Sequence, residues 1–209
     1  MPYNYTINAD IIDIRNDIPK EQDIILVDSN VWYWLTYTRA SQSTTGPNAY
    51  QINTYPSYIA MALSAKSKLL WSGLSFAELA HRIEQVEREI YNATNSMNVN
   101  TKEFRHNLPN ERNNVTSQIE AAWAQVKSMG SSLENLIIDA QTTDEALINI
   151  KTQAMDGYDL FITSSLMRQG HVKVLTDDGD YSNVPGIQVF TGNRGVIRSA
   201  RTQGKIVVR

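Results

Sequence analysis

The stretch DIILVDSNVWYWL, residues 23–35, is the strongest local indication of the fold. Four consecutive apolar residues, 24–27, run directly into Asp28, Ser29 and Asn30, and apolar residues resume behind them. A short apolar run that ends in turn-forming polar residues is typical of a central parallel strand buried on both faces. Because open parallel sheets bind ligands at the carboxyl ends of their strands, Asp28 and Asn30 are candidates for a functional site.

Composition limits the class of protein. The chain has 209 residues, of which 42% are hydrophobic and 20% charged, and this indicates one globular domain, 1–209, with an ordinary core. It contains no cysteine, which excludes disulfides, thiolate nucleophiles and cysteine-based zinc sites and suits a reducing cytoplasm. The N-terminus lacks the pattern of a signal peptide, and no apolar run approaches the roughly 18 residues that span a bilayer. We therefore expect a cytoplasmic protein without a membrane partner.

The rest of the chain alternates short apolar runs with amphipathic helical patterns. This alternation predicts an α/β fold, a three-layer α/β/α sandwich with a mostly parallel central sheet. Further strands are expected at KLLWSG (68–73), VKVLT (172–176), IQVFT (187–191) and GKIVV (204–208). The clearest helices are expected at 75–91, 112–129, 142–154 and 156–169.

Three segments fall outside this regular pattern. Residues 1–22 are expected to form an irregular lead-in, and 92–140 to form a helical insertion whose first part, 92–110, is a loop. The segment 191–209 is basic: no Asp or Glu follows Asp180, although the net charge of the chain is −3. Such a segment is either a solvated tail or a local surface for phosphates. Its cations are Arg194, Arg198, Arg201, Lys205 and Arg209.

Two predicted strands end in acids. Asp28 follows the strand at 24–27, and Asp178 and Asp180 follow the strand at 172–176. A single acid at such a place is as readily a turn former or a helix N-cap. If the two strands are neighbours, however, their carboxylates lie close together, and like charges held close need a cation or a proton between them.

Two further acids open predicted helices. Glu78 fits a capping box with Ser75, and Asp159 fits the N3 position of a helix whose N-cap is Asp156. Asp159 nevertheless heads the apolar run DLFITSSL, and an acid at the start of a buried helix needs a partner. A shared metal ion is one such partner. Oxygen-only ligands are those that Mg²⁺ or Mn²⁺ prefers, and these ions promote phosphodiester hydrolysis.

These residues, in this order, resemble the four conserved elements of the PIN-domain ribonucleases, a family that includes the VapC-type toxins. ILVDSNVW is similar to the opening hhhDxN element, with Asp28 and Asn30. LSFAELAH is similar to the second element, with Glu78, and GYDLFITSSLMRQG to the third, with Asp159.

VLTDDGDY is similar to the fourth element, T-x-D-x-D-[FY]. In that register Asp177 is the variable residue, and Asp178 is the better candidate for the metal site. The aligned residues are Thr176, Asp178, Asp180 and Tyr181.

The resemblance implies a Mg²⁺- or Mn²⁺-dependent endoribonuclease, either a VapC-like toxin or a longer stand-alone PIN protein. It implies an RNA substrate, a homodimer and, for a toxin, an antitoxin protein as partner. The implied catalytic and metal-binding residues are Asp28, Glu78, Asp159 and Asp178, supported by Asn30, Thr176 and Asp180. The candidates for contact with RNA are Arg82, Arg194, Arg198 and Arg201.

Two other functions stay open on the sequence. One is a PIN-like module that only binds RNA or protein, with an idle acidic site. The other is a phosphohydrolase of the haloacid dehalogenase type, because in those enzymes too a strand ends in an Asp. That chemistry needs a second Asp two residues later as general acid, and this chain has Asn30 in that place.

Overall fold

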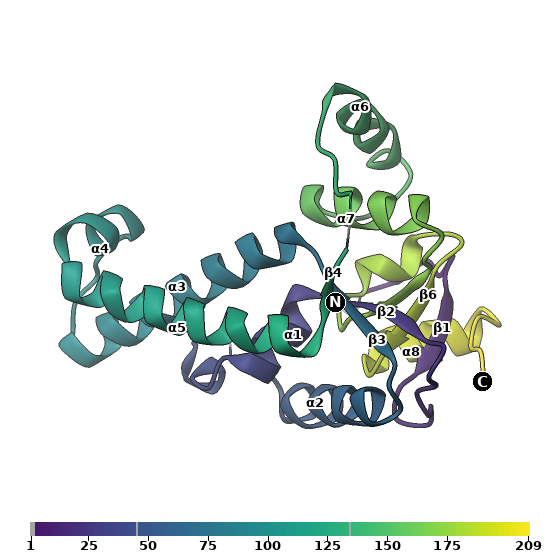
Figure 1. Ribbon diagram of the computed structural model, residues 1–209, viewed down its shortest axis with the longest axis horizontal. Coiled ribbons are helices and arrows are strands. Elements are labelled where there is room, and N and C mark those ends of the chain that lie inside the picture. The colour runs from purple at the N-terminus through teal and green to yellow at the C-terminus, as the bar shows by residue number, and fades with distance from the viewer. Residues whose placement is uncertain (1–2, 45, 134) are drawn as a thin grey trace.

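The computed structural model describes residues 3–44, 46–133 and 135–209, and its strands and helices alternate along much of the chain (Figure 1). The strands are β1 (Asp10–Asp13), β2 (Ile24–Val27), β3 (Lys68–Trp71), β4 (Ser131–Ser132), β5 (Lys173–Leu175) and β6 (Gln188–Thr191). The helices are α1 (Ser29–Thr36), α2 (Ala49–Ser64), α3 (Gly73–Asn95), α4 (Thr101–Asn107), α5 (Pro109–Met129), α6 (Ala140–Asn149), α7 (Gly157–Arg168) and α8 (Arg194–Thr202). Two short 3₁₀ helices are η1 (Ala40–Gln42) and η2 (Asp180–Asn183).

The sheet is parallel throughout, in the order β1-β6-β5-β2-β3-β4. This confirms the expected α/β fold. The chain adds β3 and β4 on one side of β2 and then returns to add β5 and β6 on the other side. Neighbouring strands β2 and β5 therefore flank the point where the direction of growth reverses, and open α/β sheets bind their ligands at such a point.

The two faces of the sheet pack against different helices. Alternate residues of β2 point to opposite faces, so Ile25 and Val27 join one core and Leu26 joins the other. The first core includes residues of α1, α2, α3 and α5, whereas the second includes residues of α6, α7 and α8. Helices on both faces of one sheet make the three-layer α/β/α sandwich that the alternation predicts.

The N-terminal segment corrects one expectation. Asp10–Asp13 is not irregular but forms the edge strand β1, which pairs with β6. Ile11 and Ile12 are both buried, one in each core. The partner strand lies near the other end of the chain, so no local pattern reveals the pairing. Residues 1 and 2 of the predicted lead-in lie outside the described residues.

The predicted insertion is largely a helical arm, defined here as residues 84–129, which extends away from the sheet (Figure 1). It contains most of α3, with α4 and α5. The expected loop at 92–110 is wrong in part, because α3 continues to Asn95 and α4 occupies Thr101–Asn107. The insertion also ends before residue 140, since Ser131–Ser132 pairs with β3 as β4. Residue 134 lies outside the described residues.

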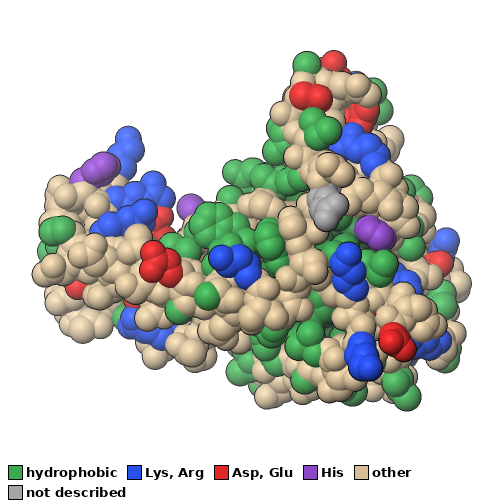
Figure 2. Space-filling view, viewed as in Figure 1, with side chains coloured by type: hydrophobic (Ala, Val, Ile, Leu, Met, Phe, Trp, Pro, Cys, Tyr) green, Lys and Arg blue, Asp and Glu red, His purple; other side chains and the backbone are tan. Residues whose placement is uncertain are grey.

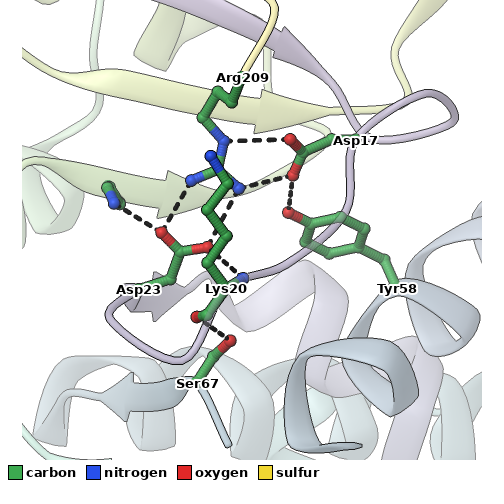
Figure 3. A network of polar contacts seen from close by, with 7 residues as sticks. Asp17, Lys20, Asp23, Tyr58, Ser67 and Arg209 are labelled. Atoms are coloured by element: carbon green, nitrogen blue, oxygen red, sulfur yellow. Dashed lines mark hydrogen bonds and ion pairs between the residues drawn. The ribbon is translucent and has the colours of Figure 1, made fainter. Parts of the chain in front are cut away.

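Arg209 is held in a network of polar contacts (Figure 3), and its side chain is only 10% exposed. Arg209 donates from Nη2 to Asp17 Oδ2 at 2.7 Å and from Nη1 to Asp23 Oδ1 at 2.7 Å. Lys173 Nζ donates to the same Asp23 oxygen at 2.6 Å. The Arg209 guanidinium also lies 4.6 Å from the centroid of the Phe190 ring. For this residue neither alternative holds, because Arg209 is neither solvated nor free to bind phosphate.

Burial alone would raise the pKa of Asp23, but hydrogen bonds from Arg209 and Lys173 outweigh it and lower the pKa below the usual 3.8. The network therefore stabilises the fold above the ordinary carboxyl pKa, and this stabilisation is lost as the pH falls through the lowered value.

The first prediction concerns this network. Arg209→Ala leaves buried Asp17 without its cation and buried Asp23 with Lys173 alone, so we expect the free energy of unfolding to fall by about 3 kcal/mol at neutral pH. Urea denaturation followed by circular dichroism measures it. Arg168→Ala, which breaks the exposed pair with Glu145, is the matched control and should cost less than about 1 kcal/mol. Equal losses in the two variants would contradict the prediction.

Candidate metal centre

Asp28 is held at the end of β2 by hydrogen bonds to both of its carboxylate oxygens. Its Oδ1 accepts from the backbone N–H of Ser29 at 2.6 Å, which makes it the N-cap of α1. Its Oδ2 accepts from Thr176 Oγ1, beyond the end of neighbouring β5, at 2.6 Å. Asp28 is thus both the predicted helix cap and a buried carboxylate at the switch point, the place between β2 and β5 where the strand order reverses.

Glu78 does not have the capping role that its spacing from Ser75 suggested. The N-cap of α3 is Ser72, whose Oγ accepts from the backbone N–H of Ser75 at 3.1 Å. Glu78 therefore lies one turn further into the helix, half-buried, and its side chain accepts a hydrogen bond from Ser29. The capping interpretation is wrong, and the carboxylate is available to the site.

Asp159 reaches the same place from the other face of the sheet. Asp156 caps α7 by accepting from the backbone N–H groups of Tyr158 and Asp159 at 3.0 and 3.2 Å, as the spacing predicts. The carboxylate of Asp159 is buried and accepts from the hydroxyl of Tyr181 at 2.6 Å. The tyrosine of the predicted T-x-D-x-D-Y element thereby orients the acid that opens α7.

Three of the four predicted ligands converge. Asp28, Glu78 and Asp159 each offer one carboxylate oxygen, and these oxygens all lie within 4.8 Å of one another. Burial, followed by the charge of the neighbouring acids, raises the pKa of both Asp28 and Asp159. Burial raises the pKa of Glu78 as well. We refer to these three residues as the carboxylate cluster.

Asp178 borders the carboxylate cluster without joining it. Among the described residues the close group does not include Asp178, which is half-buried and whose charge raises the pKa of Asp28 and Glu78. Its Oδ1 accepts from the backbone N–H of Asp180 at 2.9 Å. Asp180 itself is exposed. The predicted ligand Asp178 is therefore a neighbouring acid, one step further out than the other three.

Thr176 joins the parts of the site. Its hydroxyl donates to Asp28 and accepts from the backbone N–H of Asp178 at 2.8 Å and from Asn30 Nδ2 at 3.3 Å. Within the described residues, the buried Oδ1 of Asn30 has no hydrogen-bond partner. An unsatisfied buried carbonyl is costly, so this atom is suited to a water or another donor in the site.

Two acids have roles that the sequence did not reveal. Asp156, expected only as a cap, is exposed beside the cluster, and its charge raises the pKa of Glu78, Asp159 and Asp178. The only signal for it was its place three residues before Asp159. Asp177 faces α2 instead.

The Asp177 carboxylate anchors α2. It accepts from the hydroxyl groups of Tyr50 and Tyr55 at 2.8 and 2.6 Å, and from Gln51 Nε2 at 2.6 Å. Asp177 is therefore occupied by contacts with α2 and does not join the carboxylate cluster.

A pocket of about 1020 Å³ adjoins the cluster. Ser29, Asn30, Glu78 and Asp156 line it near the cluster, and other lining residues come from the arm. Figure 2 shows the molecule hollowed between the arm and the side that carries α6 and α7, with Lys, Arg and His side chains gathered toward the α4 end of the arm. The pocket therefore connects an acidic region to a basic one.

Of the predicted RNA contacts, Arg82 lines this pocket. Its guanidinium lies 5.6 Å from the centroid of the Tyr33 ring and donates to Gln85. The other candidates, Arg194, Arg198 and Arg201, are exposed on α8 and do not line this pocket. Arg201 Nη2 also lies 3.7 Å from Asp13 Oδ2.

A scan against protein-family models finds no match, and a search of curated proteins finds no relative of significant sequence similarity. No helix in the described ranges is long and apolar enough to cross a membrane.

The second prediction follows from the raised pKa values. Between the ordinary pKa of 3.8 and the raised folded-state value, the folded chain binds more protons than the unfolded chain, so stability falls as the pH rises. Asp159→Asn replaces a carboxyl that the folded chain must keep protonated or hold against neighbouring charges, and it keeps an acceptor for Tyr181. We expect it to raise the free energy of unfolding by about 1–2 kcal/mol near pH 8 in a chelator, with a smaller gain near pH 4.

Urea denaturation across this pH range measures the difference. Asp144→Asn, at an exposed position on α6, is the control and should leave the pH dependence unchanged. A destabilised Asp159→Asn variant at every pH would contradict the prediction.

Proposed function

We propose that this protein is a divalent-metal-dependent ribonuclease of the PIN type, with Asp28, Glu78 and Asp159 as the protein ligands of Mg²⁺ or Mn²⁺. The observation that carries the proposal is the convergence of three carboxylate oxygens within 4.8 Å at the switch point of a parallel sheet. The four motif elements, in order along the chain, support the same assignment.

The donor set fits such an ion. All three groups are carboxylates, the ligands that hard divalent cations prefer, whereas zinc sites are usually built with Cys or His. The raised pKa values of Asp28 and Asp159 reflect burial and mutual repulsion, and a bound cation offsets both because it attracts the charged carboxylates. Asn30 Oδ1 adds an acceptor for a water at the edge of the group.

Each surrounding residue then has a role in positioning. Thr176 holds Asp28, and Tyr181 holds Asp159, so both acids keep one orientation as ligands. Asp178 and Asp156 add negative charge at the rim, where they can accept hydrogen bonds from ordered waters. When bound, the metal ion supplies an activated water and charge stabilisation at the phosphoryl and leaving oxygens.

The motif resemblance carries the remaining parts of the proposal. RNA is the proposed substrate, and a homodimer in the cytoplasm is the proposed form of the protein. An antitoxin is the proposed partner if the chain acts as a toxin.

The third prediction tests the activity. Purified protein should cleave a mixed pool of RNA in Mn²⁺ or Mg²⁺ and not in EDTA. Asp28→Ala should lower the cleavage rate by about 100-fold or more, because it removes a ligand from a site that supplies several kcal/mol. Gel analysis of end-labelled RNA measures the rate, and Asp144→Asn is the control.

Equal cleavage by wild type and Asp28→Ala would identify a contaminant and refute the assignment. A complete lack of metal-dependent cleavage by a correctly folded chain, together with Mn²⁺ binding too weak to detect by calorimetry, would favour the idle binding module.

The fourth prediction separates positioning from ligation. Thr176→Val keeps the shape of the side chain but removes the hydrogen bond to Asp28, so we expect a loss of about 10- to 100-fold in Mn²⁺ affinity or in cleavage. Isothermal titration with Mn²⁺ measures the affinity. Thr163→Val, a buried threonine on α7 whose hydroxyl has no partner among the described residues, is the matched control.

A further inference from the structure

The arm carries two arginines that share one buried acid. Arg105 donates from Nε to Glu84 Oε1 at 2.5 Å and from Nη2 to Glu84 Oε2. Arg112 Nη1 donates to Glu84 Oε1 at 3.2 Å. Two cations and one anion leave an excess positive charge. Both arginine side chains keep 42% of their surface exposed, whereas the side chain of Glu84 is 6% exposed.

This excess charge lines the same pocket as Glu78, one member of the carboxylate cluster. Glu84, Arg105 and Arg112 are lining residues, together with Glu78 and Asp156. Along α3, the six residues from Glu78 to Glu84 correspond to a rise of about 9 Å. Arg82 and His81 lie on the helix between them and also line the pocket. A chain that passes along this pocket therefore meets a cation-binding region first and arginines next.

The size and lining of the pocket favour one kind of occupant. About 1020 Å³ is at the upper end of the range for small-molecule sites, so it admits a few linked nucleotides and not the two backbones of a duplex. Trp34, which is half-buried, lies on its wall and is suited to stacking with an unpaired base, whereas Tyr33 is buried beneath Arg82. Arginine pairs well with phosphate, because its planar fork makes two parallel hydrogen bonds.

We propose that the arm is the phosphate-binding part of the substrate site, and that Arg105 and Arg112 hold the backbone of a single-stranded RNA on one side of the bond to be cleaved. That the held strand is a substrate rests on the ribonuclease function proposed above. The binding itself does not, because the arginines lie outside the carboxylate cluster.

The test measures binding without cleavage. Fluorescence anisotropy of a labelled single-stranded RNA of about 12 nucleotides, within the range that single-strand-binding proteins cover, is recorded in EDTA at several salt concentrations. Arg105→Gln with Arg112→Gln should weaken binding by about 10-fold at low salt. The plot of log affinity against log salt should also become shallower, with the magnitude of its negative slope reduced by about 1.4 for two lost phosphate contacts.

Arg168→Gln is the matched control, because this arginine is also 42% exposed and paired with an acid but lies on α7. It should bind RNA like the wild type. An unchanged affinity and salt slope in the double variant would overturn the proposal, and so would an equal loss in the control.

A second variant keeps the proposal testable if the double variant folds poorly. Glu84→Gln leaves the two arginines without their shared charge, so RNA affinity should rise by several-fold even though the arm is less stable. If the arginines only fasten the helices of the arm, the same variant should lower RNA affinity or leave it unchanged, and this result would overturn the proposal.

Competitors test the kind of occupant. A duplex of the same sequence that binds as tightly as the single strand would overturn the single-strand assignment, and an acidic polypeptide that competes as well as RNA would assign the arm to a protein partner instead.

Asp28→Ala separates the two proposals, since it should bind RNA in EDTA at least as well as the wild type. Binding without any cleavage refutes the ribonuclease and not the arm.

Discussion

Repulsion among buried carboxylates is the constraint on which the site depends. Asp28, Glu78 and Asp159 bring their oxygens within 4.8 Å of one another, in surroundings that already disfavour charge. Hydrogen bonds from Thr176 and Tyr181 favour the charged forms, but burial and mutual charge outweigh them and raise the pKa of both aspartates. Without a cation the folded chain must retain protons there, at a cost in stability as the pH rises.

The parallel sheet is what holds these groups together against that repulsion. Asp28 and Thr176 follow adjacent strands, and their hydrogen bond joins the two strand ends where the chain reverses its order. Next to Thr176, the side chains of Asp177 and Asp178 contact different parts of the protein. Asp177 turns toward α2 and accepts from tyrosine hydroxyl groups, while Asp178 faces the carboxylate cluster. One helix is thereby fixed to the loop that carries the neighbouring acid.

The charges along the pocket follow from the way the arm is built. Glu84 fastens α3 to α4 and α5 through its two arginines, and the same contacts orient both guanidinium groups at the pocket wall. The buried Glu84 therefore determines where the positive charge of the arm is exposed. Glu78 and Glu84 lie on one helix, α3, so the distance from the carboxylate cluster to the acid that holds the arginines is set by helical rise rather than by a flexible loop.

The sequence by itself determined what depends on neighbours along the chain. The apolar run at 24–27 specified β2, Asp28 and Asp156 were recognisable as helix caps, and the alternation of strand and helix patterns specified the α/β class. These features rest on local backbone preferences and on periodic burial, which a short window contains.

Only the tertiary structure decided what depends on distant partners. Strand β1 exists because it pairs with β6. Arg209 is largely shielded from solvent because it pairs with Asp17 and Asp23, and Glu78 is free for the site because Ser72 caps α3 in place of Ser75. In each case the local sequence also fits a plausible alternative. The contacts made on folding decided between the alternatives, because pairing a strand edge or a buried charge outweighs the small local preferences that compete with it.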